Sequence, residues 1–206
     1  MQIKKTLQIL CENGFKIVPP YSCEDILRIA VEEGLFEEDD LFDEYSDKDA
    51  LGLTFKLLAE DGGDYTSSYC ENLLYSEFET YDGYETYMYI VERLVEMTRG
   101  SLKLDNLKTG YSEQKSGEDG EGRVWISFEF RDKEYKFSYK FEKWFDHIDI
   151  FTPIIKLLEI ADSTKIFAYQ DFDEMLAIIC ISKEDLKKLN KSFRGVNLKP
   201  LSQKFE

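Results

Sequence analysis

Histidine, paired cysteines and long apolar runs are what this sequence lacks. Its 206 residues include one histidine, His147, which excludes a zinc site built from several histidines and leaves histidine acid–base catalysis to a single side chain. The four cysteines, Cys11, Cys23, Cys70 and Cys180, lie far apart and form no C-x-x-C pair. This spacing excludes a cysteine-dense small scaffold, and we expect four reduced thiols in the core.

Apolar runs long enough for a membrane are also missing. No stretch approaches the roughly 18 apolar residues that cross a bilayer. Residues 1–13 lack the continuous apolar segment of a secretory signal. We therefore expect a cytoplasmic protein with no membrane partner.

Basic residues are scarce in one third of the chain. From Glu24 to Glu92, 21 acidic residues stand against Arg28, Lys48 and Lys56, a net charge of −18, whereas the other 137 residues hold 21 acids and 23 bases, a net charge of +2. A field of this sign repels nucleic acid and anionic membranes and speeds encounter with a basic partner or groove. We therefore predict a basic protein partner and no nucleic acid.

The composition nevertheless indicates a folded chain. Hydrophobic residues make up 43% and aromatic residues 15% of it, unlike the aromatic-poor composition of disordered acidic chains. At this length the chain can bury a core as one large domain or two small ones. The acidic third is thus predicted to fold.

Helical spacing of apolar residues predicts a mainly helical first hundred residues. Ser22 followed by Asp25 has the order of a capping box and opens the second helix, which Gly34 ends. Asp47 or Asp49 is the expected cap of the third helix. The apolar stripes of the four helices are Ile3 to Leu10, Ile26 to Val31, Leu51 to Leu58, and Tyr84 to Val95.

Alternation of apolar and polar residues predicts a β-hairpin over residues 123–142, with Asp132-Lys133 as a two-residue turn. In this register the charged pairs have opposite sign and a tryptophan faces a lysine. The pairs are Phe130 with Tyr135, Phe128 with Phe137, Ile126 with Tyr139, Val124 with Phe141, Arg131 with Glu134, Glu129 with Lys136, Arg123 with Glu142, and Trp125 with Lys140. A bulged turn is the alternative, because Asp-Lys is not a favoured pair for a type I′ turn.

The remaining second half predicts three more strands and two helices. The strands are Ser101 to Lys108, Lys165 to Tyr169, and a nearly all-apolar central strand, Met175 to Ile181; one helix begins at Asp149 or Thr152 with Pro153, and one begins at Ser182 with Asp185. The fold class is therefore α+β, with an acidic helical region (1–100) packed against a mostly antiparallel sheet flanked by helices (101–206), as one compact unit.

Two carboxylate clusters allow a catalytic alternative, a metal-dependent hydrolase or transferase. They are Asp146, His147 and Asp149, and Asp171, Asp173 and Glu174. The first cluster is more simply a helix cap and the second an acidic hairpin loop, and no nucleophile or phosphate-binding motif supports either. We therefore expect no enzyme, no catalytic or metal-binding residues and no cofactor.

The acidic third supplies the candidate binding residues. Its carboxylates lack the glycine-containing order of a calcium loop, and like charges crowded so tightly cost stability unless a partner compensates. Tyrosine interleaved with acids is typical of binding surfaces. The candidates are Glu37, Glu38, Asp39, Asp40, Asp43, Glu44, Tyr75, Glu77, Glu79, Tyr81, Asp82 and Tyr84, with Tyr75, Tyr81 and Tyr84 the tyrosines expected to be most exposed.

A family resemblance gives this surface a more specific meaning. The run Glu134–Phe141, followed by Trp144-Phe145-Asp146, a helix and a paired strand ending in Ser182–Leu186, resembles bacterial immunity proteins of polymorphic and contact-dependent growth-inhibition toxin systems. The resemblance covers residues 123–190. It implies a tight inhibitory complex with a toxin domain, often a nuclease, whose phosphate-binding groove the carboxylates occupy. An acidic regulatory or scaffold protein remains a further alternative.

Overall fold

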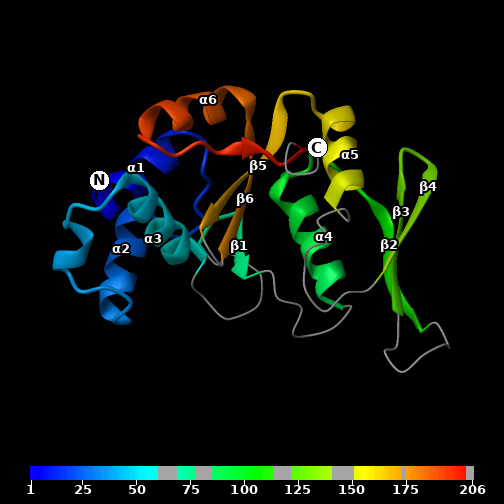
Figure 1. The fold of residues 1–206 in the computed structure, drawn as a ribbon, viewed down its shortest axis with the longest axis horizontal. Helices are drawn as coiled ribbons and strands as arrows, with labels where there is room; N and C mark the ends of the chain where they lie inside the picture. Colours follow the sequence, from blue (N-terminus) through cyan, green and yellow to red (C-terminus); the bar gives the residue numbers. More distant parts are fainter. Residues whose placement is uncertain (60–68, 78–84, 114–121, 141–150, 173–174, 203–206) are drawn as a thin grey trace.

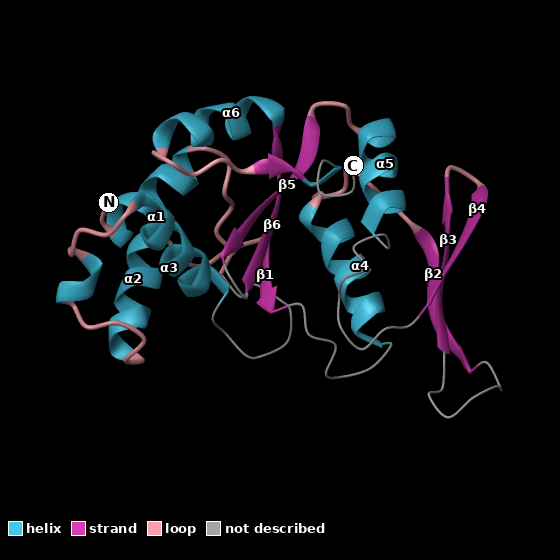
Figure 2. Cartoon of the chain, in the orientation of Figure 1, coloured by secondary structure: helices cyan, strands magenta, loops and turns pink. Residues whose placement is uncertain are grey.

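The computed structural model describes residues 1–59, 69–77, 85–113, 122–140, 151–172 and 175–202. Its helices are α1 (Ile3–Glu12), α2 (Cys23–Glu32), the short 3-10 helix η1 (Asp39–Leu41), α3 (Asp47–Ala59), α4 (Glu85–Met97), α5 (Phe151–Ala161) and α6 (Lys183–Ser192). Its strands are β1 (Leu73–Glu77), β2 (Asp105–Glu113), β3 (Gly122–Phe130), β4 (Lys133–Lys140), β5 (Lys165–Phe172), β6 (Met175–Ser182) and β7 (Lys199–Pro200). The fold is α+β, as predicted, and Figure 2 shows how helices and strands alternate across the molecule.

The elements form four successive layers (Figure 1). A four-stranded antiparallel sheet, in the order β1-β6-β5-β7, lies in the middle. Helices α1, α2, α3 and α6 cover one face of this sheet, and α4 and α5 cover the other. A second antiparallel sheet, β2-β3-β4, packs on the far side of α4 and α5. The acidic helices α2, η1 and α3 therefore lie on the side of the molecule opposite the second sheet, whereas α4 packs against that sheet.

The central sheet divides the interior into two cores. Along β6, Ile179 and Ile181 belong to the core beneath the acidic helices, whereas Ile178 and Cys180 belong to the core around α4 and α5. Successive side chains of a strand point to opposite faces, so a strand buried on both sides is apolar throughout. The expectation of a central strand here is confirmed.

The helix starts follow the predicted signals with two exceptions. As predicted, Ser182 caps α6, accepting a hydrogen bond from Asp185 N at 3.0 Å. The first exception is α3, whose cap is Ser46 and not Asp47 or Asp49. Ser46 Oγ accepts from Asp49 N at 3.1 Å, as expected of a capping serine three residues before an acid. Helix α5 begins at Phe151, two residues before Pro153.

The hairpin forms, but its register is two residues from the predicted one. Phe130 pairs with Lys133, so the turn residues are Arg131 and Asp132, at φ +52° and +60°. Positive φ at both turn residues is the type I′ geometry that matches strand twist. A two-residue shift keeps every side chain on its predicted face, since that face repeats every second residue.

The predicted cross-strand charge pairs are therefore wrong. Glu129 lies opposite Glu134, Arg123 opposite Lys140 and Ser127 opposite Lys136. The expected contact of Trp125 with Lys140 is replaced by one with Lys136, whose Nζ lies 4.8 Å from the Trp125 ring centroid. The apolar face is the same in both registers and packs in the core around α5. Burial therefore does not distinguish the two registers, and the observed one follows the turn at Arg131 and Asp132 in place of the surface charge pairs.

Two strand predictions need correction. The strand expected at residues 101–108 runs instead from Asp105 to Glu113, with a register shift after Asp105 and Asn106 at φ +53°. Strand β1 was not predicted, and it places the acidic third inside the central sheet through its pairing with β6. Residues 1–100 and 101–206 therefore share one sheet.

Among the described residues, no helix combines the length and apolar character required to cross a membrane.

Candidate functional site

The carboxylates of residues 37–44 form a shelf around η1, between α2 and α3. Five of the six are exposed, and Asp40 is half-buried. The six carboxylates of this shelf are Glu37, Glu38, Asp39, Asp40, Asp43 and Glu44. The structure thus brings the first six predicted binding residues together on one outward surface.

Apolar side chains fix the shelf to the core. Leu41 is 5% exposed, and Leu35 and Phe36 pack against the same core from the chain entering η1. The half-buried Asp40 turns its carboxylate back to accept a hydrogen bond from Glu37 N at 2.9 Å. These contacts hold the carboxylates in place before any partner arrives.

Helix α1 holds the far end of the shelf. Gln2 Nε2 donates to the carbonyl of Phe42 at 2.8 Å, and Tyr45 N donates to the carbonyl of Met1 at 3.2 Å. Because both ends are hydrogen-bonded, the backbone of the shelf has little conformational entropy left to lose when a partner binds.

A groove of about 430 Å³ opens between the shelf, α1 and α2. The buried Leu27 and Leu41 lie at its base, and Phe42, 49% exposed, stands at its side. The groove is lined by Lys4, Glu24, Leu27, Arg28, Val31, Glu32, Glu38, Leu41 and Phe42. We call this feature the acidic groove.

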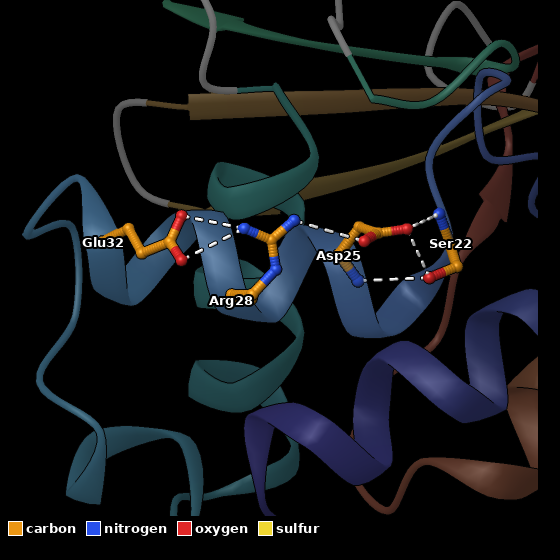
Figure 3. Close-up of polar contacts among 4 residues, drawn as sticks. All are labelled: Ser22, Asp25, Arg28 and Glu32. Atoms are coloured by element: carbon orange, nitrogen blue, oxygen red, sulfur yellow. Dashed lines mark hydrogen bonds and ion pairs between the residues drawn. The ribbon is translucent and has the colours of Figure 1, made fainter.

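The guanidinium of Arg28 is neutralised within its own helix (Figure 3). Its nitrogens lie 2.9 Å from Glu32 Oε2 and 3.3 Å from Asp25 Oδ1, one helical turn to either side. The hydrogen bonds to Glu32, and then those to Asp25, raise the pKa of Arg28. Arg28 therefore offers little positive charge to the groove.

Asp25 is held as a carboxylate by the helix cap. Hydrogen bonds from the Ser22 hydroxyl and backbone N, followed by that from Arg28, lower its pKa below the ordinary value of 3.8. Ser22 Oγ in turn accepts from Asp25 N at 3.1 Å, which completes the predicted capping box. The box fixes the first turn of α2, from which Glu24 lines the groove.

Two groove carboxylates are without an ion-pair partner among the described residues. In the described part of the chain, Glu24 and Glu38 form no ion pair, whereas Lys4 lies with its Nζ 5.5 Å from the Phe42 ring centroid. The groove thus combines unpaired carboxylates with an apolar base and an aromatic ring. This combination suits a long cationic side chain, whose methylenes pack on apolar surface while its charged end meets the acids.

For the other six predicted binding residues, the structure either contradicts the expectation or does not describe the side chain. Tyr75, expected to be exposed, is half-buried in β1, with its ring centroid 6.3 Å from that of Phe55 and 6.2 Å from that of Phe172. The expectation is wrong because Tyr75 shares a strand face with the buried Leu73. Glu77 lies in β1 but its side chain is outside the described residues, as are Glu79, Tyr81, Asp82 and Tyr84.

Sequence reasoning missed the other side of the groove. Phe42 was detectable, because an apolar ring among eight nearby acids is unusual for a solvated segment. Lys4 gave no signal, since it reaches the groove only through the packing of α1 against α2 and η1.

The carboxylates of the catalytic alternative mostly fall outside the described residues. This applies to Asp146, His147, Asp149, Asp173 and Glu174, while Asp171 lies in β5. Within the described ranges, no group of three or more His, Cys, Asp or Glu side chains is placed to hold a metal ion.

Two other grooves differ in chemistry from the acidic one. A groove of about 490 Å³ between β4 and α5 is mainly apolar, and one of about 360 Å³ beside α6 carries Lys183, Lys187 and Lys199. Neither is lined by a carboxylate. Of these three grooves among the described residues, the acidic groove is the one that matches the charge segregation of the sequence.

No protein-family model, curated protein or solved structure was found to match this chain.

Proposed function

We propose that this chain is a non-enzymatic cytoplasmic binding protein that captures a basic protein partner in the acidic groove. The observation that carries the proposal is a pair of carboxylates, Glu24 and Glu38, that form no ion pair in the described part of the chain and line the same groove as the buried Leu27 and Leu41. A basic side chain of the partner inserts between Phe42 and these acids. The surrounding shelf steers it there.

The charge of the shelf supports rapid capture. Long-range attraction raises association rates between oppositely charged surfaces, and the effect weakens as salt screens it. Dissociation depends instead on the buried contacts of the groove, above all on Phe42 and its neighbours. Different residues of the site therefore set the association rate and the dissociation rate.

More specifically, we propose that the partner is the basic, nuclease-like domain of a bacterial toxin and that this chain is its immunity protein. A nuclease binds phosphates in a basic groove, and a rigid row of carboxylates presents negative charge in a similar way. This proposal rests on the resemblance of residues 123–190 and on the acidic shelf together. Immunity proteins of this kind are encoded beside their toxins.

The test uses the C-terminal domain encoded by the gene next to this one as the probe. We expect the quadruple variant E37Q/E38Q/D39N/D40N to associate with that domain about tenfold more slowly at low salt and to lose most of the salt dependence. Stopped-flow measurements over a salt series give both quantities. Co-expression with the active toxin domain, scored as host survival, tests immunity itself.

A matched control makes the result specific to the shelf. The variant D105N/D132N/E134Q/E159Q removes the same charge from exposed positions on the second sheet and α5, and it should keep most of the wild-type rate. If both variants associate equally slowly, the net charge of the protein sets the rate, and the proposed role of the shelf is wrong. An unchanged rate in the shelf variant, or no binding of the neighbouring domain, overturns the proposal.

A further inference from the structure

Two thiols meet where α1 ends and α2 begins. Cys11 lies in the last turn of α1 and Cys23 is the first residue of α2, and their Sγ atoms are 2.7 Å apart. The sulfurs of a disulfide are about 2.05 Å apart, so the pair is roughly 0.6 Å from bonding distance. Both residues are at helix ends, where small backbone shifts cost least.

This pair is more accessible than the other two thiols. Cys11 and Cys23 are half-buried, whereas Cys70 is fully buried and Cys180 is 4% exposed. Cys70 also donates to Asn72 Oδ1 at 3.4 Å. A soluble oxidant can therefore reach Cys11 and Cys23 but not Cys70 and Cys180.

We propose that Cys11 and Cys23 are a redox modification site, which a low-molecular-weight disulfide such as oxidised glutathione converts to an intramolecular disulfide. The proposal concerns the chain itself and holds whether or not the partner is a toxin. It follows from the separation of the two sulfurs and their shared access to solvent.

The chemistry is two successive thiol–disulfide exchanges. The Cys23 thiolate attacks one glutathione sulfur, breaks the glutathione S–S bond and releases one glutathione. The Cys11 thiolate then attacks Cys23 Sγ and releases the second. Two electrons pass from the protein to one oxidised glutathione, and the two cysteine protons end on the two glutathione thiols.

The order of the two steps follows from the surroundings of Cys11. Burial, followed by the hydrogen bond with Cys23, raises the pKa of Cys11, so this thiol is the poorer first nucleophile. Cys23 is the first residue of α2 and is half-buried. Once the mixed disulfide has formed, Cys11 is already beside the sulfur that it must attack.

The new bond would clamp the two helices that line the acidic groove. Lys4 comes from α1, and Glu24, Leu27, Arg28, Val31 and Glu32 come from α2. Oxidation therefore fixes the spacing of the groove walls and removes freedom from the unfolded chain.

The test incubates the full chain with glutathione buffers of increasing oxidised fraction, followed by alkylation under denaturing conditions and mass spectrometry. Before alkylation, we expect the intact mass to fall by two hydrogen atoms; after it, the oxidised chain should carry two alkyl groups where the reduced chain carries four. One linked peptide pair should join Cys11 to Cys23, and the melting temperature should rise by about 5–10 °C. Cys70 and Cys180 should remain fully alkylatable. The matched variants Cys11→Ser and Cys23→Ser should lose both the linkage and the rise in melting temperature.

Two outcomes would contradict the proposal. If the wild-type chain keeps four alkylatable thiols in the most oxidising buffer, the site does not exist. A mixed glutathione adduct that persists on Cys23 of the wild-type chain would likewise overturn the proposal, because it would mean that Cys11 does not reach it. Both results are read on the unmodified sequence, so they do not depend on how well the variants fold.

Discussion

At the scale of single residues, Asn72 shows how one buried amide joins distant parts of the chain. Its Nδ2 donates to the carbonyls of Gly14 at 3.1 Å and Cys180 at 2.9 Å, and its Oδ1 accepts from Lys16 N at 3.0 Å. The side chain is 3% exposed. It therefore satisfies three backbone groups, of which the Cys180 carbonyl is buried, between the end of α1 and strand β6.

We predict that Asn72→Ala lowers the free energy of unfolding by about 3 kcal/mol, because it leaves these backbone groups without partners. Asn72→Asp should cost a similar amount, since the carboxylate retains an acceptor for Lys16 N but donates to neither carbonyl. Urea unfolding followed by circular dichroism measures both variants. A loss below about 1 kcal/mol in both would show that the amide is replaceable by solvent.

The role of a single residue could be predicted from the sequence where its interaction partner is close in the chain. The capping box at Ser22 and the N-cap at Ser182 could be recognised because the interacting groups are three residues apart. The roles of Asn72 and Tyr75 could not, because they depend on which strand lies beside β6 and which face it presents. Local chemistry predicts local contacts only.

At the scale of elements, the β3–β4 hairpin illustrates what alternation leaves undetermined. Alternation predicts which side chains share a face, but two registers that differ by two residues satisfy it equally. The turn selects between them, and here Arg131 and Asp132 accept positive φ. Arg131 also lies 5.0 Å from the ring centroid of its neighbour Phe130 and donates to the carbonyl of Ile160 at 3.3 Å, a tertiary contact that no local pattern reveals.

We predict that Asp132→Gly raises the free energy of unfolding by about 0.5–1 kcal/mol, because glycine adopts a φ of +60° without steric cost. Arg131→Gly should gain less, since it gives up the contacts with Phe130 and Ile160. Thermal unfolding of the two variants and the wild type provides the comparison. If Asp132→Gly is the less stable protein, the backbone there does not have the type I′ geometry.

At the scale of the whole molecule, the sequence supported the fold class but not the layer order. The apolar stripes indicated which faces are buried, and the apolar strand β6 indicated a central sheet. The insertion of β1 beside β6 and the separation into two sheets arise from long-range pairing, which tyrosine-rich and acidic residues near β1 obscure. For the site, the acidic shelf was predictable from composition, while the groove needed the placement of α1.

Charge segregation also has a cost that can be measured on the free protein. The chain carries a net charge of −16, concentrated in residues 24–92 of the sequence. We predict that its melting temperature rises as NaCl increases from about 0.02 M to 0.5 M, because the Debye length shortens from roughly 20 Å to 4 Å and like-charge repulsion is screened.

The shelf variant E37Q/E38Q/D39N/D40N should start at a higher melting temperature and respond less to salt. Differential scanning calorimetry at each salt concentration measures both trends. A melting temperature that falls with salt would indicate that attractive ion pairs, and not repulsion, dominate the surface.

The two-sided burial of β6 supplies the protein with paired internal reporters. Ile178 and Ile179 are neighbours in sequence, yet their methyl groups lie in different cores on opposite faces of one sheet. In a methyl-labelled nuclear magnetic resonance spectrum, the Ile179 signal reports on the interior beneath the groove, and the Ile178 signal serves as its reference from the other side. Comparing these two signals as a ligand is added thus shows whether the ligand changes one core or both.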